Sequence, residues 1–382
     1  MTADIVETGT QTVAAIPAPS ARKKQLVLVL SRVWAWVFLG ALILFFAVSV
    51  NVQSHGDVNF LTIRNSENIL MAIVPVLLMG LGQTFVVIAA GIDLSVGWVM
   101  GLSSVVSAMV NVALIDKGIY EPVAIALGSL AGVLAAMIPG LINGAIIAWL
   151  RIPSFIVTLG MSFIARGVAF LLSGGNVVGG QPQAERDLGN EALLYLISGQ
   201  GGGLYFLRPP PVTGEALRQL DRILQWPVVI TFVLVLLMLF VLHKTQFGRH
   251  VYAIGGNREA AMRAGIPVDR HTIVLYTLSA ATAGTAGVLT TARFSGGSSI
   301  AGDPLLLSSI AAVIIGGVSM FGGEGSVSGT LIGSLIIAVM TTGLVMLNVQ
   351  PFWQYIVVGV VVILAVLIDQ GRDLIVGRME TG

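Results

Sequence analysis

Residues 244–270 read KTQFGRHVYAIGGNREAAMRAGIPVDR, a polar segment between two long apolar stretches of the chain. The segment holds five basic residues against two acidic ones, in a chain of which only 10% is charged. Positively charged loops resist translocation, so we expect this loop on the cytoplasmic side of a membrane. Residues 257–264 favour a short helix, because alanines stand there among arginine and glutamate. The segment therefore predicts a small cytoplasmic helix that docks another protein.

The rest of the chain has the composition of a membrane protein. Of its 382 residues, 55% are hydrophobic, and the mean hydropathy is +0.92. Soluble domains are about 25% charged, far above this chain. Apolar runs of about 20 residues recur, each long enough to cross a hydrocarbon layer about 30 Å thick. We predict an all-α, polytopic membrane protein, and the absence of cysteine excludes disulfides.

Ten membrane spans can be placed along the sequence. They cover residues 33–50, 69–90, 94–114, 123–150, 155–173, 228–243, 273–293, 305–321, 327–347 and 352–368. With the N-terminus inside, the cytoplasmic segments collect twelve basic residues and the opposite side seven. This bias predicts that both termini are cytoplasmic. The chain then divides into a tail (1–32), a five-helix half (33–173), an external Gly/Pro-rich loop (174–226), a second five-helix half (227–369, with the cytoplasmic loop 244–270) and a second tail (370–382).

The two sets of five spans resemble each other. GSLAGVL at 128–134 is echoed by GSVSGTL at 325–331, an offset of 197 residues. An odd number of spans per copy means that the second copy crosses the membrane in the opposite direction. Inverted repeats of this kind are typical of transporters with alternating access. The alternative is a chance similarity between glycine-rich apolar helices.

Residues 91–97 read GIDLSVG and stand between the second and third spans. Asp93 follows 25 uncharged residues, immediately before a helix start. An acid at this place can accept the free amide protons of the first helical turn. A proton or cation site is the functional alternative, because acids within membranes are often functional. We single out Gly91, Asp93, Ser95 and Gly97 as a structural motif.

Arg166 is the one basic residue plainly inside a predicted span, since Arg293 stands at the very end of the span 273–293. It either lines a route through the membrane, where it could bond to a polar solute, or extends to the external surface. The predicted substrate path consists of Phe155, Thr158 and Arg166.

The sequence offers no catalytic machinery. None of the four lysines follows a glycine, so the phosphate-binding pattern GxxxxGK[ST] is absent. The four histidines lie outside the spans or at their edges and form no metal-binding or acid/base constellation: His55, His243, His250 and His271. We therefore predict a chain that is not an enzyme, with no cofactor or metal of its own.

Several motifs together resemble the permease subunit of the ribose/xylose-type ABC importers of monosaccharides. They are GIDLSVG at 91–97, PSFIVTL at 153–159, AIGGNREAAMRAGI at 253–266, IGG at 315–317 and FWQYIVVG at 352–359. The resemblance implies a multi-pass protein of the bacterial inner membrane that imports a pentose or hexose. It implies partner ATPase subunits that use ATP and Mg, a periplasmic sugar-binding protein and a second permease copy, identical or related. Lipid surrounds such a protein, and no nucleic acid is implied.

The same resemblance assigns the loop 244–270 to coupling with the ATPase. The matching residues are Gly255, Gly256, Asn257, Arg258, Glu259, Ala260 and Ala261, with Gly265 at the following turn. We expect Gly255, Gly256 and Gly265 to permit the turns at the ends of a short rigid helix. An ordinary anchoring loop is the alternative. For the whole chain, the alternative function is an ion-coupled secondary transporter of a small polar solute, although its spans hold almost no ionisable residues.

Overall fold

The computed structural model describes residues 21–197, 204–207, 220–350, 352–360 and 363. Within these residues, eight helices are long and apolar enough to cross a membrane. They are α1 (Ala21–Gln53), α2 (Ile63–Ile88), α3 (Val96–Asp116), α4 (Glu121–Leu150), α5 (Ser154–Ser173), α8 (Trp226–Lys244), α11 (Val268–Phe294) and α13 (Val327–Met346). The predicted class, an all-α polytopic membrane protein, is confirmed.

Shorter elements fill the connections. They are α6 (Gln183–Asn190), β1 (Ala192–Ile197), β2 (Leu204–Phe206), β3 (Leu220–Gln225), α9 (Gln246–Gly256), α10 (Arg258–Arg263), η1 (Asp303–Leu305) and α12 (Leu306–Ile315). The three strands form an antiparallel sheet in the order β2-β1-β3, with Leu194 opposite both Phe206 and Ile223. The segment 174–226 is thus more than the loop we expected. Tyr195 anchors the sheet, because its buried hydroxyl accepts the amide of Ala192 at 3.0 Å.

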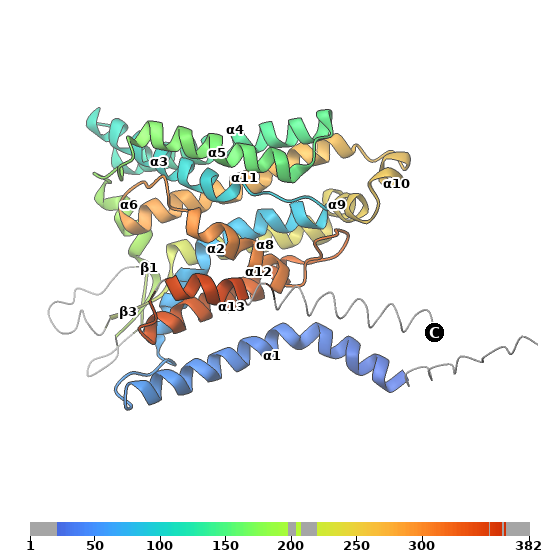
Figure 1. The fold of residues 1–382 in the computed structure, drawn as a ribbon. Coiled ribbons are helices and arrows are strands. Elements are labelled where there is room, and N and C mark those ends of the chain that lie inside the picture. Colours follow the sequence, from blue (N-terminus) through green and yellow to red (C-terminus); the bar gives the residue numbers. More distant parts are fainter. Residues whose placement is uncertain (1–20, 198–203, 208–219, 351, 361–362, 364–382) are drawn as a thin grey trace, which may run out of the picture.

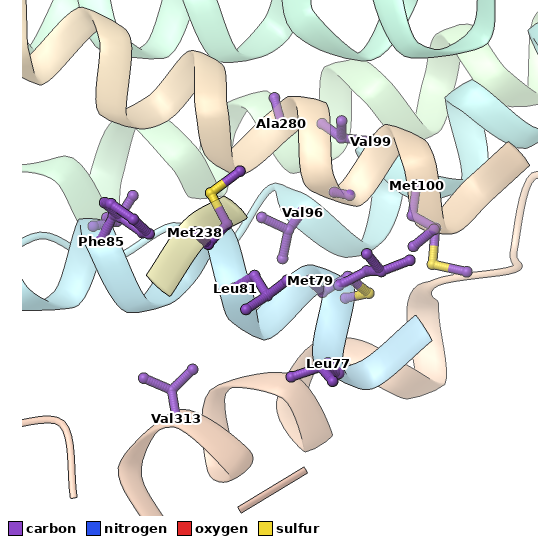
Figure 2. Packing of buried hydrophobic residues seen from close by; sticks show 14 of the residues in the cluster. Leu77, Met79, Leu81, Phe85, Val96, Val99, Met100, Met238, Ala280 and Val313 are labelled. Carbon is purple, nitrogen blue, oxygen red and sulfur yellow. The ribbon is translucent and has the colours of Figure 1, made fainter. Parts of the chain in front are cut away.

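Helix α2 lies at the centre of the bundle (Figure 1). Helices α3, α4, α5 and α11 lie on one side of it, and α12, α13 and α1 lie on the other. Apolar side chains surround α2, as expected for a fully enclosed helix. Figure 2 shows Leu77, Met79, Leu81 and Phe85 of α2 among side chains of neighbouring helices: Val96, Val99, Met100, Met238, Ala280 and Val313.

The two ends of the bundle differ. Helices α9 and α10 lie at the end where α1 begins, and α6 and the sheet lie at the opposite end (Figure 1). The helix contacts also come in matching sets: α11 packs against α4 and α3, and α2 packs against α13 and α12. In the same way α3 packs against α4, and α12 packs against α13.

One predicted span is shorter in the structure, and another is described only in part. The span expected at 305–321 is wrong in extent, because α12 ends at Ile315 and Gly317 turns the chain with a φ of +80°. With η1 it forms a short apolar helix, Asp303–Ile315. Of the span expected at 352–368, residues 352–360 are helical and most of the remainder lies outside the described residues. The tail 370–382 and residues 1–20 lie outside them too, and α1 begins at Ala21, inside the predicted N-terminal tail.

Candidate functional site

The polar loop 244–270 folds into two short helices. The expected helix is confirmed as α10, and its N-cap is Asn257, whose side-chain oxygen accepts the amide of Ala260 at 2.9 Å. Helix α9 precedes it and was not predicted. Gly265 follows with a φ of +82°, so its predicted turn is confirmed. Ala261 is buried against Ile254 and Val268, which fixes α10 on α9 and on the start of α11.

Helix α9 is wedged against the end of α2 and the loop 316–326. A side chain at Gly255 would collide with the carbonyl oxygen of Ile88, which also accepts the amide of Gly323 at 2.8 Å. The hydroxyl of Tyr252 donates to the carbonyl of Gly325 at 2.7 Å. Gly255 therefore permits close packing, and its predicted role in a turn is wrong. Gly256 is the last residue of α9 and has open space around its Cα.

The outer face of α10 is charged and exposed. Glu259 and Arg263 form a pair at 3.8 Å, one turn apart, with side chains that are 79% and 84% exposed. Arg258 lies 3.6 Å from Asp269, at the start of α11. These exposed pairs contribute little to stability. The face is therefore free to exchange its internal ion pairs for contacts with a partner.

The motif 91–97 forms an extended segment held by α5. Ser154, Thr158 and Ser162 follow one another at intervals of four, so their hydroxyls share one face of α5. Ser154 and Thr158 accept the amides of Ile92 and Leu94, each at 3.1 Å, and Ser162 donates to the carbonyl of Leu94 at 2.7 Å. This polar stripe satisfies backbone groups that have no helical partner. The spacing S-x₃-T-x₃-S was visible in the sequence and could have indicated this contact.

Asp93 is 2% exposed, and both of its oxygens are occupied. Oδ1 accepts the amide of Ser95 at 3.0 Å and its hydroxyl at 2.6 Å, and Oδ2 accepts the hydroxyl of Ser279 at 2.8 Å. Asn143 of α4 donates to the hydroxyl oxygen of Ser95 at 3.0 Å. The N-cap of α3 is Ser95, so the cap expected from Asp93 is wrong in detail. The carboxylate joins the extended segment to α11 instead.

The glycines of the motif permit close contacts. A Cβ at Gly91 would lie 2.5 Å from the hydroxyl of Tyr276, and one at Gly97 would lie 2.9 Å from the carbonyl oxygen of Gly302. Gly91 also lines a cavity of about 280 Å³ together with Arg258. The motif 91–97 and the loop 244–270, which are far apart in the sequence, thus line the same cavity.

The three residues of the predicted substrate path lie on α5 in different surroundings. Thr158 is buried and bonded to the segment 91–97. Phe155 is 49% exposed on the outside of the helix. The guanidinium of Arg166 lies over the ring of Trp98, 4.6 Å from its centroid. Their place along a substrate route stays a prediction.

The structure brings together two histidines that sequence reasoning left apart. His250 Nδ1 lies 3.0 Å from His271 Nε2, and His271 Nδ1 lies 2.9 Å from the carbonyl of Pro267. Burial lowers the pKa of His250, and the charges of His271 and Arg249 lower it further. The pair ties α9 to α11. Within the described part of the chain, no group of three or more His, Cys, Asp or Glu is arranged to hold a metal ion.

Known proteins resemble this chain over most of its length. The family described as the permease component of branched-chain amino acid transport systems matches residues 65–366. The fructose import permease protein of Rhizobium meliloti is 37% identical over 79% of this chain and 76% of its own length. The xylose transport system permease protein of Haemophilus influenzae is 34% identical, over 87% of this chain and 94% of its own length. The ribose import permease protein of Escherichia coli K12 is 34% identical, over 89% and 96%. No solved structure matches the chain.

Proposed function

The chain belongs to this family of transport-system permease components, and we propose that it is the membrane subunit of an ATP-driven importer of a monosaccharide. The observation that carries the proposal is the similarity to permeases named for fructose, xylose and ribose along most of the chain. The chain is a multi-pass transport component of the inner membrane and not an enzyme. Its substrate is a pentose or hexose in this proposal, delivered by a binding protein and driven by separate ATPase subunits that hold ATP and Mg.

The coupling contact is proposed for α10 and the residues around it. The exposed face of α10 supports this, because Glu259 and Arg263 are free to bond with a partner. Helix α9 supports it too, since its close contacts with Ile88 and with the loop 316–326 offer a rigid link into the bundle. A displacement of α10 by the ATPase would reach α2 and the segment 91–97 through these contacts. The end of the bundle that holds α9, α10 and the start of α1 is cytoplasmic in this proposal, and the C-terminus lies on the same side.

The two halves are proposed to be inverted repeats of five helices each. The matching helix contacts support this, since α2 with α13 and α12 corresponds to α11 with α4 and α3. Alternating access would then arise from a movement of one half against the other. A second permease copy completes the channel in this proposal, and the end with α6 and the sheet faces the binding protein. Phe155, Thr158 and Arg166 remain the predicted substrate path.

Transport by reconstituted vesicles tests the function. Vesicles should take up radiolabelled D-fructose, D-xylose or D-ribose only when the chain is combined with its binding protein, its ATPase and ATP. A secondary transporter would behave differently. If this chain alone accumulates a sugar in response to a proton or sodium gradient, the importer proposal is overturned.

The coupling contact has its own prediction. Glu259→Arg should reduce the stimulation of ATP hydrolysis by more than about tenfold, since a contact with a charged group contributes about 1.5–3 kcal/mol. Glu324→Arg is the matched control, because Glu324 is an exposed acid in the loop 316–326, outside α10. Size-exclusion chromatography should show unchanged assembly of the permease. If the two variants stimulate ATP hydrolysis equally, Glu259 is not part of the contact with the ATPase.

A further inference from the structure

A cavity of about 310 Å³ lies within the bundle, away from the predicted substrate path. Its walls come from α2, α11, α12, α13 and the helical residues 352–360. Most of the lining is apolar, with Met71, Val74 and Leu289 among the contributors. Five polar side chains from four helices also line it: Thr290, Arg293, Ser308, Thr341 and Gln354.

Only part of this polar lining is already paired. Arg293 donates from Nη1 to the carbonyl of Met71 at 3.0 Å, and the hydroxyl of Thr341 donates to the carbonyl of Ile337 at 2.9 Å. The side chains of Thr290, Ser308 and Gln354 have no hydrogen-bond partner among the described residues. None of their polar atoms is among the buried unpaired atoms of the described residues, so these groups face the open space of the cavity. They are available there to bond with a polar occupant.

We propose that this cavity binds a neutral polyhydroxylated solute of the size of one monosaccharide. Hydroxyl groups both donate and accept, which suits the hydroxyls of Thr290 and Ser308 and the amide of Gln354. The cavity volume lies at the small end of ligand sites, which measure about 300–1,000 Å³ and are mostly apolar with a few placed polar groups. The one charged group, Arg293, donates to the carbonyl of Met71, and its guanidinium lies 5.3 Å from the centroid of the Phe294 ring. It therefore offers hydrogen-bond donors to a solute and is not an open binding site for an anion. The inference rests on the proposed function and names a substrate site for it.

The position of the cavity fits a site that opens and closes. Its α2 wall belongs to the first half of the chain, and the α11, α12 and α13 walls belong to the second. Any movement of one half against the other changes the distance between Met71 and Thr341, or between Pro75 and Thr290. Polar contacts with a sugar would then differ between the two states, which is what couples binding to a conformational change.

The natural absence of cysteine makes the cavity directly testable. Thr290→Cys and Gln354→Cys place a single thiol in its wall, and Thr285→Cys is the matched control. Thr285 lies on the same helix as Thr290, bonds to the carbonyl of Ala281 at 2.9 Å and does not line the cavity. Each variant is reconstituted with its partner subunits and labelled with a small hydrophilic methanethiosulfonate. D-fructose, D-xylose and D-ribose are the probes, and sucrose at equal osmolarity controls for solute effects.

At least one of the three monosaccharides should slow labelling of both cavity variants by about threefold or more at saturating concentration, because only the empty fraction reacts. Thr285→Cys should label at the same rate with and without sugar. If the complex imports a sugar that protects neither cavity variant, the cavity proposal falls and the importer function stands. Labelling by a lipid-soluble maleimide alone, with no reaction of the hydrophilic reagent, would show an acyl-filled cavity and also overturn it. If no sugar is imported and none protects, both proposals fall.

Discussion

Arg293 replaces a hydrogen bond that Pro75 removes from α2. Proline has no amide proton, so the carbonyl four residues earlier, that of Met71, loses its helical partner. Arg293 of α11 donates to this carbonyl at 3.0 Å. A backbone defect in the first half of the chain is thus satisfied by a side chain from the second half. This contact could not be predicted from the sequence, because Pro75 and Arg293 are far apart in it.

Arg293→Met should lower the free energy of unfolding by about 1–3 kcal/mol, because it leaves the carbonyl of Met71 unpaired. The loss should shrink in a Pro75→Ala background, where an amide at position 75 can restore the helical bond. Denaturant unfolding of the two single variants and the double variant in detergent measures this coupling. Strictly additive losses would mean that Arg293 does not serve the carbonyl of Met71.

Asp93 holds the extended segment by two contacts that can be separated. Ser279→Ala should cost about 1–3 kcal/mol of unfolding free energy, because Oδ2 of the buried carboxylate loses its hydroxyl donor. Ser328→Ala, at an exposed serine, is the control and should change stability by less than about 0.5 kcal/mol. The same variants can be assayed by thermal unfolding. If the two variants lose the same unfolding free energy, Asp93 does not link the extended segment to α11.

The sequence predicted the helices whose signals are local. Hydropathy located the long spans, and the alanines among arginine and glutamate at 257–264 located α10. Helix α9 was not predicted, because its glycines, valine and tyrosine are poor helix formers. It is nevertheless helical, because tertiary packing at Gly255 overrides that local preference. The contact of His250 with His271 and the sheet at 192–225 depend on long-range packing, for which a single sequence carries no periodic signal.

Helix α6 is attached to α3 through a buried carboxyl group. Glu185 is 1% exposed, and its Oε2 accepts the side-chain amide of Asn111 at 2.8 Å. Burial raises the pKa of Glu185 from 4.5 to about 7, and the bond from Asn111 opposes this rise. The folded state therefore binds the proton more tightly than the open state does. The attachment of α6 is strongest below about pH 4.5 and weakens as the pH rises through about 7.

Hydrogen exchange should show this dependence in the amides of α6. After correction for the intrinsic rate, protection at pH 5 should exceed that at pH 8 by about tenfold or more, since one pKa unit corresponds to a factor of about ten. Glu185→Gln should keep the high protection at both pH values, because its amide carries no charge. Asp187→Asn on the same helix should leave the pH dependence in place. If the protection of the α6 amides in the wild type does not depend on pH, Glu185 does not control the attachment of this helix.

A pair of equivalent positions from the two halves of the chain meets between α2 and α11. Ser279 stands 197 positions after Gly82, the offset of the sequence repeat, and a side chain at Gly82 would collide with the Cα of Ser279. Gly97 and Gly302 also lie against each other, since a Cβ on either would meet the other's carbonyl oxygen, but they stand 205 positions apart and are not equivalent by this offset. A contact between equivalent positions, such as that of Gly82 with Ser279, is expected where a pseudo-twofold axis passes between α2 and α11. This contact supports the inverted repeat that the echo at 128–134 indicates.

Gly82→Ala tests whether this close contact holds the halves together. The added methyl has no room beside Ser279 and Thr282, so α2 and α11 must separate, and overpacking of this kind costs about 1–3 kcal/mol. Gly160→Ala is the matched control, because Gly160 lies within helix α5 with open space around it and alanine favours the helix by up to about 1 kcal/mol. Thermal unfolding in detergent should therefore place the first variant below the wild type and the second at or above it. Should Gly82→Ala unfold at the wild-type temperature, the helices are not in contact at the proposed axis.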